Sequence, residues 1–346
     1  MRKKMQSPKN VTLITGAMLL SAATGAQALE VKNGNDKVNL KLYGHINRAV
    51  MFVDDGNEDK MFHVDNTNSE SRVGLKAKVK TDAMTIGGNV EVQWQANPSD
   101  QVSMDEESIS SELKERKMEV YFDTKVGKFS LGRGDMSSDD SSEVDLSGTA
   151  LAGNVGVADV GGGFEFYDAA GMVDDEEGGM TVGDVFDQMD GLSRRNRVRY
   201  DTPSFGGFSL GVSAGEKERA DATLIYSNKF ADGTKLEGAL AYVDPGEGKD
   251  YTQLNGSVSV LFGFGLNVTV AGGSRDLDDM PANGDDPTFM YGKIGYKCKE
   301  LVSAGPTAIS VDYGVYSNIE NQDTEEEGTA YGIQFVKNFS VYSSAL

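Results

Sequence analysis

The sequence predicts an all-β fold, an antiparallel β-barrel that spans a membrane, and three observations support this prediction. Apolar and polar residues alternate strictly in many short segments. The spacers between these segments are alternately short and long, and the long spacers are acidic. The polar face carries rows of Lys and Arg, while aromatic residues stand at the ends of the apolar face. A soluble sheet also alternates, so the basic rows and the terminal aromatic residues are what favour a barrel.

The alternation is clearest between Ser71 and Lys80. Successive side chains of a strand point to opposite faces. One face therefore carries Val73, Leu75, Ala77 and Val79, and the other carries Arg72, Lys76, Lys78 and Lys80. We count about fourteen such strands, each near the ~9–11 residues of a membrane strand or slightly shorter. They cover residues 40–52, 71–80, 84–95, 117–123, 128–131, 195–201, 208–214, 224–230, 236–242, 254–262, 266–270, 290–296, 309–315 and 331–335.

The spacers indicate how these strands connect. Short spacers at 81–83, 126–127, 231–233 and 263–265 predict tight hairpins. Longer acidic spacers separate the hairpins, as periplasmic turns and extracellular loops do in outer-membrane barrels. The longest spacer lies between Arg133 and Arg194. Because a structureless loop of about sixty residues is usually functional, this segment is the first place to look for a site.

The first residues have the three parts of a secretory signal peptide. Four cations come first, an apolar stretch follows from Val11 to about Ala23, and Ala26-Gln27-Ala28 has the A-x-A form of a cleavage site. The apolar stretch is shorter than the ~20 residues of a membrane-spanning helix. An N-terminal anchor and a disordered tail are the alternatives. We expect a signal peptide over residues 1–28 and a barrel over residues 29–346, so the protein is exported.

Composition narrows the function classes. The net charge is −21, and removal of the four leader cations changes it to −25. Such a charge repels phosphate and argues against nucleic acid as a partner. The single cysteine, Cys298, has no partner for a disulfide within the chain, so a closed sheet is the expected source of stability. The 42 Gly and 7 Pro residues suit tight turns and close strand packing.

Four motifs, in order along the chain, resemble those of the Gram-negative general porin family, specifically its proteobacterial sixteen-stranded members. They are Leu42-Tyr43-Gly44, Ser71-Arg72-Val73-Gly74, the GKFSLGR of residues 127–133, and residues 195–208, which end in the TPSFGGF turn. The resemblance covers residues 40–339. It implies a homotrimeric outer-membrane pore through which ions and small hydrophilic solutes diffuse passively, without a cofactor and without enzyme activity.

The resemblance also implies a constriction, because in this family the loop after the fifth strand folds into the lumen and sets acids against a basic wall. The expected loop acids are Asp135, Asp139, Asp140, Glu143 and Asp145. The expected wall cations are Arg72, Lys76, Arg133, Arg195, Arg197 and Arg199. Parity places Arg133 on the apolar face, so it needs a bulge to turn inward. The alternatives are a solvated lumen wall for the lysines of residues 76–80 and an ordinary exposed loop for the acids.

The end of the chain departs from the family. Residues 342–346 stand where a fifteenth strand would begin, and the family's closing strand normally ends in Phe. We therefore expect that a closing pair of strands is missing and that the full form has sixteen. An open sheet edge in lipid would leave backbone groups without partners.

Two other functions stay open at this point: an outer-membrane barrel enzyme, and an exported soluble all-β surface or binding protein. His45 and His63 are the only histidines and are not spaced as a metal pair. The acids between Asp278 and Asp286 lack the full calcium-loop pattern. We predict no catalytic, cofactor or metal site, although divalent cations could link these acids to lipopolysaccharide phosphates. Conductance in a bilayer separates the pore from the enzyme.

Overall fold

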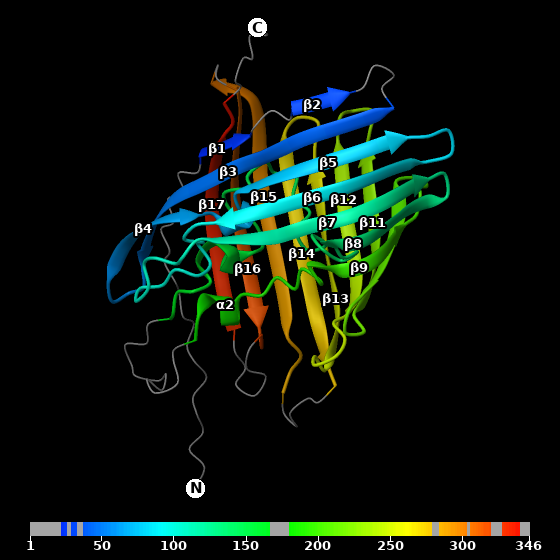
Figure 1. Cartoon of the computed structure of the whole chain (residues 1–346). Coiled ribbons are helices and arrows are strands. Elements are labelled where there is room, and N and C mark those ends of the chain that lie inside the picture. Colours follow the sequence, from blue (N-terminus) through cyan, green and yellow to red (C-terminus); the bar gives the residue numbers. More distant parts are fainter. Residues whose placement is uncertain are drawn as a thin grey trace.

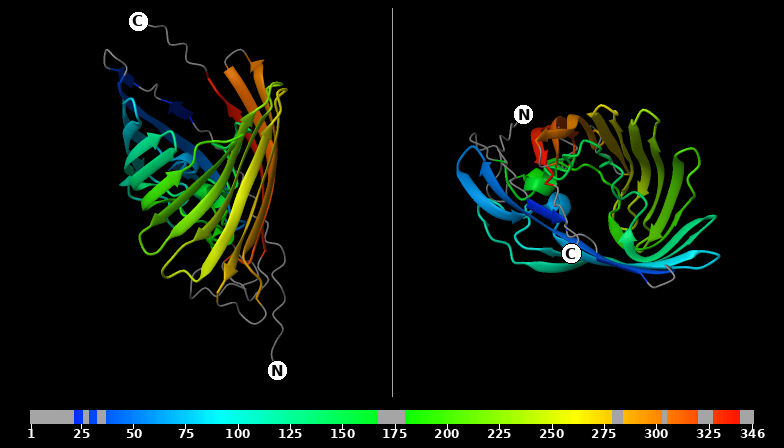
Figure 2. Two further views of the ribbon diagram at one scale, coloured as in Figure 1. Left: turned by 90° about the vertical axis from the view of Figure 1, so that its right-hand side faces the viewer. Right: turned by 90° about the horizontal axis from the view of Figure 1, so that it is seen from above.

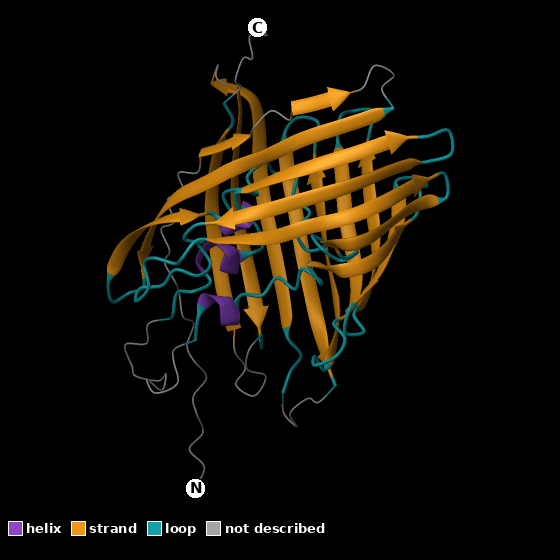
Figure 3. Ribbon diagram, in the orientation of Figure 1, coloured by secondary structure: helices purple, strands orange, loops and turns teal. Residues whose placement is uncertain are grey.

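The computed structural model describes residues 22–25, 29–32, 37–166, 180–278, 284–302, 305–319 and 327–339 (Figure 1). Strands make up nearly all of the regular structure, in one 17-stranded sheet (Figure 3). The helices of the described residues are single turns: η1 (Thr67–Ser69), α1 (Val157–Gly161) and α2 (Val182–Val185). None of these described helices has the length and hydropathy needed to cross a membrane. The all-β antiparallel prediction is confirmed.

Each of the fourteen expected strands is present. They are β3 (Val38–Asp54), β5 (Arg72–Lys80), β6 (Thr85–Gln95), β7 (Glu112–Thr124), β8 (Gly127–Asp135), β9 (Arg194–Asp201), β10 (Phe208–Gly215), β11 (Ala220–Lys229), β12 (Lys235–Asp244), β13 (Tyr251–Leu261), β14 (Leu266–Leu277), β15 (Thr288–Val302), β16 (Gly305–Ser317) and β17 (Glu327–Lys337). From β5 to β17, each strand pairs antiparallel with the next. A further strand, β4 (Asp59–Asp65), was not predicted; it pairs with the second half of β3, while β5 pairs with the first half.

The first strands lie along the other edge of β3. β1 (Ala22–Gly25) and β2 (Leu29–Lys32) both pair antiparallel with it, and β1 falls within the expected signal peptide. The rest of residues 1–28 and the expected site of strand fifteen lie outside the described residues. The sheet curls around a lumen (Figure 2). Across the described ranges, the strand registers run unbroken from β3 to β17, and none joins β17 back to β3.

The two faces of the sheet differ as the alternation predicts. On β5 the apolar side chains face outward, and Val73 is 50% exposed, as expected of a side chain that meets lipid. On β6 the polar side chains Glu91, Gln93 and Gln95 face inward and are buried. On these two strands the outward face is therefore apolar and the inward face is polar.

The described residues of the long loop, 136–166 and 180–193, lie inside the curve of the sheet (Figure 2). The first limb of the loop, residues 136–155, lies against the wall and is held there by buried serine and threonine side chains. Ser138 Oγ donates to Asp221 of β11 at 2.5 Å, Asn255 of β13 donates to Ser142 Oγ at 2.8 Å, and Thr149 Oγ1 lies 2.6 Å from Ser310 Oγ of β16. These hydrogen bonds satisfy polar groups that the loop would otherwise bury without partners.

The second limb of the loop, residues 156–166 and 180–193, packs against the sheet through apolar side chains. Phe164 packs edge-on against Phe62 of β4 with ring centroids 5.2 Å apart, and Phe186 packs against Tyr316 of β16 at 5.0 Å. The inward-facing Met51 of β3 is buried in the same cluster. The lumen wall is therefore apolar at the second half of β3, where the sequence pattern led us to expect a polar wall, because the loop packs there like a protein core.

Candidate pore constriction

A cavity of about 470 Å³ separates the long loop from the wall formed by β5, β7 and β9. Opposite charges line its two sides. The wall side presents Arg72, Arg116, Lys117 and Arg194, and the loop side presents Asp139, Asp140, Glu143, Asp159 and Asp190. This separation of charge across one narrow space is the most prominent feature of the described lumen.

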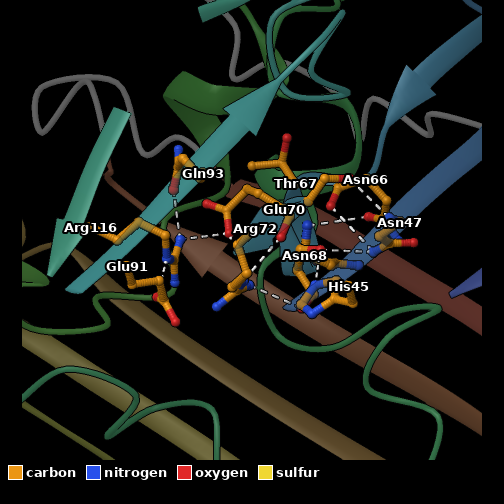
Figure 4. Close-up of polar contacts among 12 residues, drawn as sticks. His45, Asn47, Asn66, Thr67, Asn68, Glu70, Arg72, Glu91, Gln93 and Arg116 are labelled. Atoms are coloured by element: carbon orange, nitrogen blue, oxygen red, sulfur yellow. Dashed lines mark hydrogen bonds and ion pairs between the residues drawn. The ribbon is translucent and has the colours of Figure 1, made fainter. Parts of the chain in front are cut away.

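Arg116 reaches the cavity because of a β-bulge. The register of β6 with β7 shifts between Glu91 and Val92, which face Lys117 and Glu115, so Arg116 is the extra residue. Its guanidinium contacts Glu91 at 2.8 Å and Glu70 at 2.8 Å (Figure 4). The side chain is 4% exposed, so these charge-assisted contacts hold it in one orientation.

Arg72 lies beside this group on β5. Its Nη2 is 3.2 Å from Glu70 Oε2, and the same nitrogen donates to Ser69 Oγ at 3.1 Å (Figure 4). Glu70 thus accepts from two arginines and holds both at the edge of the cavity. Pairing of this kind leaves part of the arginine donors facing the cavity, since a guanidinium has five N–H groups.

Lys117 and Arg194 share one acidic partner. Both form ion pairs with Asp135, the last residue of β8, and the Arg194 Nε lies 3.3 Å from its Oδ1. Asp135 therefore belongs with the wall cations that it neutralises. Among the described residues, the loop acids that form no ion pair with a wall cation begin at Asp139, four residues later.

Three of those acids meet at one point. Carboxylate oxygens of Asp139, Asp140 and Asp190 lie within 4.8 Å of one another. Asp190 comes from the far end of the loop and accepts the backbone N–H groups of Asp140 at 3.0 Å and of Ser142 at 3.1 Å. The two limbs of the loop are thereby tied together behind the acidic side of the cavity.

Crowding of these acids changes their protonation. Burial, helped by the charge of Asp140, raises the pKa of Glu143 to about 7. Burial and neighbouring carboxylates also raise the pKa of Asp139 and of Asp190 well above the ordinary range. The charge on the loop side of the cavity therefore depends on pH near neutrality.

The structure brings together only part of the predicted set. Arg72, Asp139, Asp140 and Glu143 line the cavity, and Asp135 lines it while paired with the wall cations. Asp145 does not: it turns to the opposite wall and pairs with Lys293 of β15.

The remaining predicted cations lie elsewhere. Arg197 and Arg199 donate to the backbone carbonyl of Asp135, so they brace the start of the loop. Arg133 stays on the outward face, in register with Met118 and Asn196, because β8 carries no bulge there. Arg133 and Arg195 both line a second cavity of about 570 Å³ at the ends of β7 and β9, which is also lined by Arg116 and Arg194. Lys76 lies over the ring of Tyr43.

Several residues of the cavity were not predicted. Arg116 and Lys117 follow each other in sequence, so strict alternation places them on opposite faces, and only the bulge brings both inward. Arg194 stands at the very start of β9, one residue before the predicted strand. Asp190 lies at the far end of the long loop. A search for acids close to the next strand would have found Asp190.

Comparisons with known proteins agree with this architecture. A family model described as Gram-negative porin matches residues 15–342. The structure of Salmonella typhi OmpF in complex with daunomycin is 15% identical, covers 90% of this chain and 89% of its own, and gives a TM-score of 0.51.

Two further solved structures align at lower scores. Outer-membrane expressed OmpT of Vibrio cholerae is 14% identical over 90% of this chain and 100% of its own (TM-score 0.46). The anion-selective porin from Comamonas acidovorans is 17% identical over 86% and 98% (TM-score 0.44). No curated sequence matches. Because the family model spans nearly the whole barrel, the chain belongs to the Gram-negative porin family.

Proposed function

We propose that the charged cavity is the constriction through which this outer-membrane porin passes ions and small hydrophilic solutes by passive diffusion. The observation that carries the proposal is the separation of charge: cations of β5, β7 and β9 face the loop acids across one cavity. Opposed charges produce a transverse field that orients dipolar solutes, and the balance of the two rows sets ion preference. The set comprises Arg72, Arg116, Lys117, Arg194, Asp139, Asp140, Glu143 and Asp190.

The working unit in this proposal is a homotrimer in the outer membrane. One of the structures similar to this chain is a trimer form of Vibrio cholerae OmpT, and the family resemblance points the same way. The proposal also includes a signal peptide over residues 1–28, lipopolysaccharide as a lipid partner, and no enzyme activity. Cross-linking in detergent tests the assembly, since a trimer gives a band at three times the chain mass and a monomer does not.

Charge-neutralising variants in planar bilayers test the constriction. Arg194→Gln removes a wall cation, so we expect cation permeability to rise two- to fivefold relative to anion permeability, measured from the reversal potential in a KCl gradient. Asp140→Asn should shift the ratio in the opposite direction. Lys229→Gln is the control, because it removes one positive charge at the exposed last residue of β11 and should leave the ratio unchanged. If Arg194→Gln and Asp140→Asn both gave the same ratio as the parent protein, the cavity would not be the constriction.

A further inference from the structure

Lys293 of β15 is a fully buried cation inside the barrel. Its side chain has 0% exposure. The Nζ lies 2.8 Å from Asp145 Oδ2 and donates to the backbone carbonyl of Gly153 at 2.7 Å. Asp145 and Gly153 both belong to the first limb of the long loop, so one side chain from the wall holds the loop at two points.

A buried ammonium without a partner is costly, and removing one member of a buried ion pair usually destabilises the other strongly. Asp145 is itself 5% exposed and accepts the backbone N–H of Ser147 at 2.7 Å. The two charges therefore require each other. Because they cancel and are buried, they add little directly to the field in the pore.

The ion pair between Lys293 and Asp145 is close in sequence to the acids that line the cavity. Glu143 is two residues before Asp145, a separation of about 7 Å at the rise of extended chain. The backbone N–H groups of Val144 and Leu146, which flank these residues, donate to Ser257 Oγ at 3.0 Å and Ser259 Oγ at 2.9 Å of β13. Across the described part of residues 136–150, the pair with Lys293 is the only ion pair to a strand.

We infer that Lys293 is a positioning residue of the constriction: through Asp145 it fixes where the loop acids lie, and so determines ion preference without facing the pore. This inference rests on the proposed constriction. The hydrogen bonds to Ser257 and Ser259 are between neutral groups and can be exchanged for water when the loop moves. The buried ion pair cannot separate without leaving a charge in the wall. The ion pair on one side of the acids, and the hydrogen bonds of Ser138 to the buried Asp221 on the other, keep the acids at one distance from the wall cations.

Bilayer recordings on Lys293→Met, Lys293→Arg and the charge swap Lys293→Asp/Asp145→Lys test the inference. We expect Lys293→Met to lower the cation-to-anion permeability ratio at least twofold and to increase open-channel current noise, because the acids leave their position. Lys293→Arg should keep the parent ratio, and the charge swap should recover it. Lys229→Met, at an exposed position near the end of β11, removes the same charge and should change neither quantity. Heat-modifiable migration in detergent confirms that each variant is folded.

Three results would overturn the inference. The first is a folded Lys293→Met with the parent ratio and noise. The second is a folded charge swap that keeps the defect of the single variant. The third is failure of both Lys293→Arg and the charge swap to fold, since Lys293 would then serve folding alone. Asp140→Asn distinguishes the two proposals: if it shifts the ratio while Lys293→Met does not, the constriction stands and only the positioning role fails.

Discussion

Glu143 shows how the surroundings of one residue give the pore a pH response. Its carboxyl is half-buried, and this burial together with the charge of Asp140 raises its pKa to about 7. A carboxyl with a raised pKa is charged above that pH and neutral below it. The wall arginines keep their charge throughout, since guanidinium titrates above pH ~12. Lowering the pH therefore weakens the acidic side of the constriction alone.

We expect the cation-to-anion permeability ratio to fall as the pH is lowered from 8 to 6. Reversal potentials in a KCl gradient, measured at half-unit pH steps, give the midpoint. Glu143→Gln should have, at pH 8, the low ratio that the parent protein reaches near pH 6, and the step near pH 7 should be absent. An unchanged midpoint in Glu143→Gln would show that another group causes the titration.

The constriction residues were only partly predictable. Alternation placed Arg72 on the inward face because β5 is regular. It failed for Arg116, since a bulge depends on which partner residues meet across two strands, and one sequence segment does not contain that information. It also missed the pairing of Asp145, because Lys293 is 148 residues away and only the docked loop brings them together.

The strands themselves were predictable, because a sheet with one lipid face and one water face imposes period two on every strand. β4 was missed: it is short, and Phe62 and Val64 face inward against the loop, so the segment carries no polar face there. The pattern identifies a strand only where its two sides meet different solvents.

Packing between neighbouring strands gives a prediction at Gly87 of β6. Tyr121 of β7 is its register partner and lies over it, and a Cβ at Gly87 would come 2.2 Å from the Tyr121 Cζ. Gly87→Ala should therefore push the ring away and lower the free energy of unfolding by about 1–3 kcal/mol. Unfolding in urea, followed in detergent by the fraction of protein that migrates as the folded band, measures the change.

Gly292 of β15 supplies the matched control, because a Cβ there would meet no atom within 4 Å. Gly292→Ala should leave the unfolding midpoint close to that of the parent protein. Equal losses in the two variants would mean that the alanine side chain, rather than the contact with Tyr121, is responsible.

At the scale of the whole molecule, the long loop links parts of the sheet that no strand register joins in the described residues. Its apolar limb packs on β3 and β4 on one side and on β15 and β16 on the other. Phe186 is 3% exposed at the centre of this contact. The loop therefore stabilises the barrel as well as narrowing its lumen.

Removing Phe186 should weaken that link. Deletion of a buried Phe side chain costs about 3–5 kcal/mol, so Phe186→Ala should lower the temperature at which the folded band disappears in detergent. Phe205→Ala, at a turn position that is 90% exposed, should have little effect on that temperature. If Phe186→Ala left this temperature unchanged, the packing of Phe186 would not stabilise the barrel.

The hydrogen bonds that tie the loop to the wall have a consequence for the order of folding. They join Ser138 to Asp221 over 83 residues, Ser142 to Asn255 over 113, and Thr149 to Ser310 over 161. Contacts so distant in sequence form slowly, and each needs its strand to be in place first. The first two need only β11 and β13, whereas the last requires β16, so the loop is fastened along its whole first limb only when the sheet is nearly complete. A chain that has folded only as far as β13 can therefore form the first two of these ties but not the third.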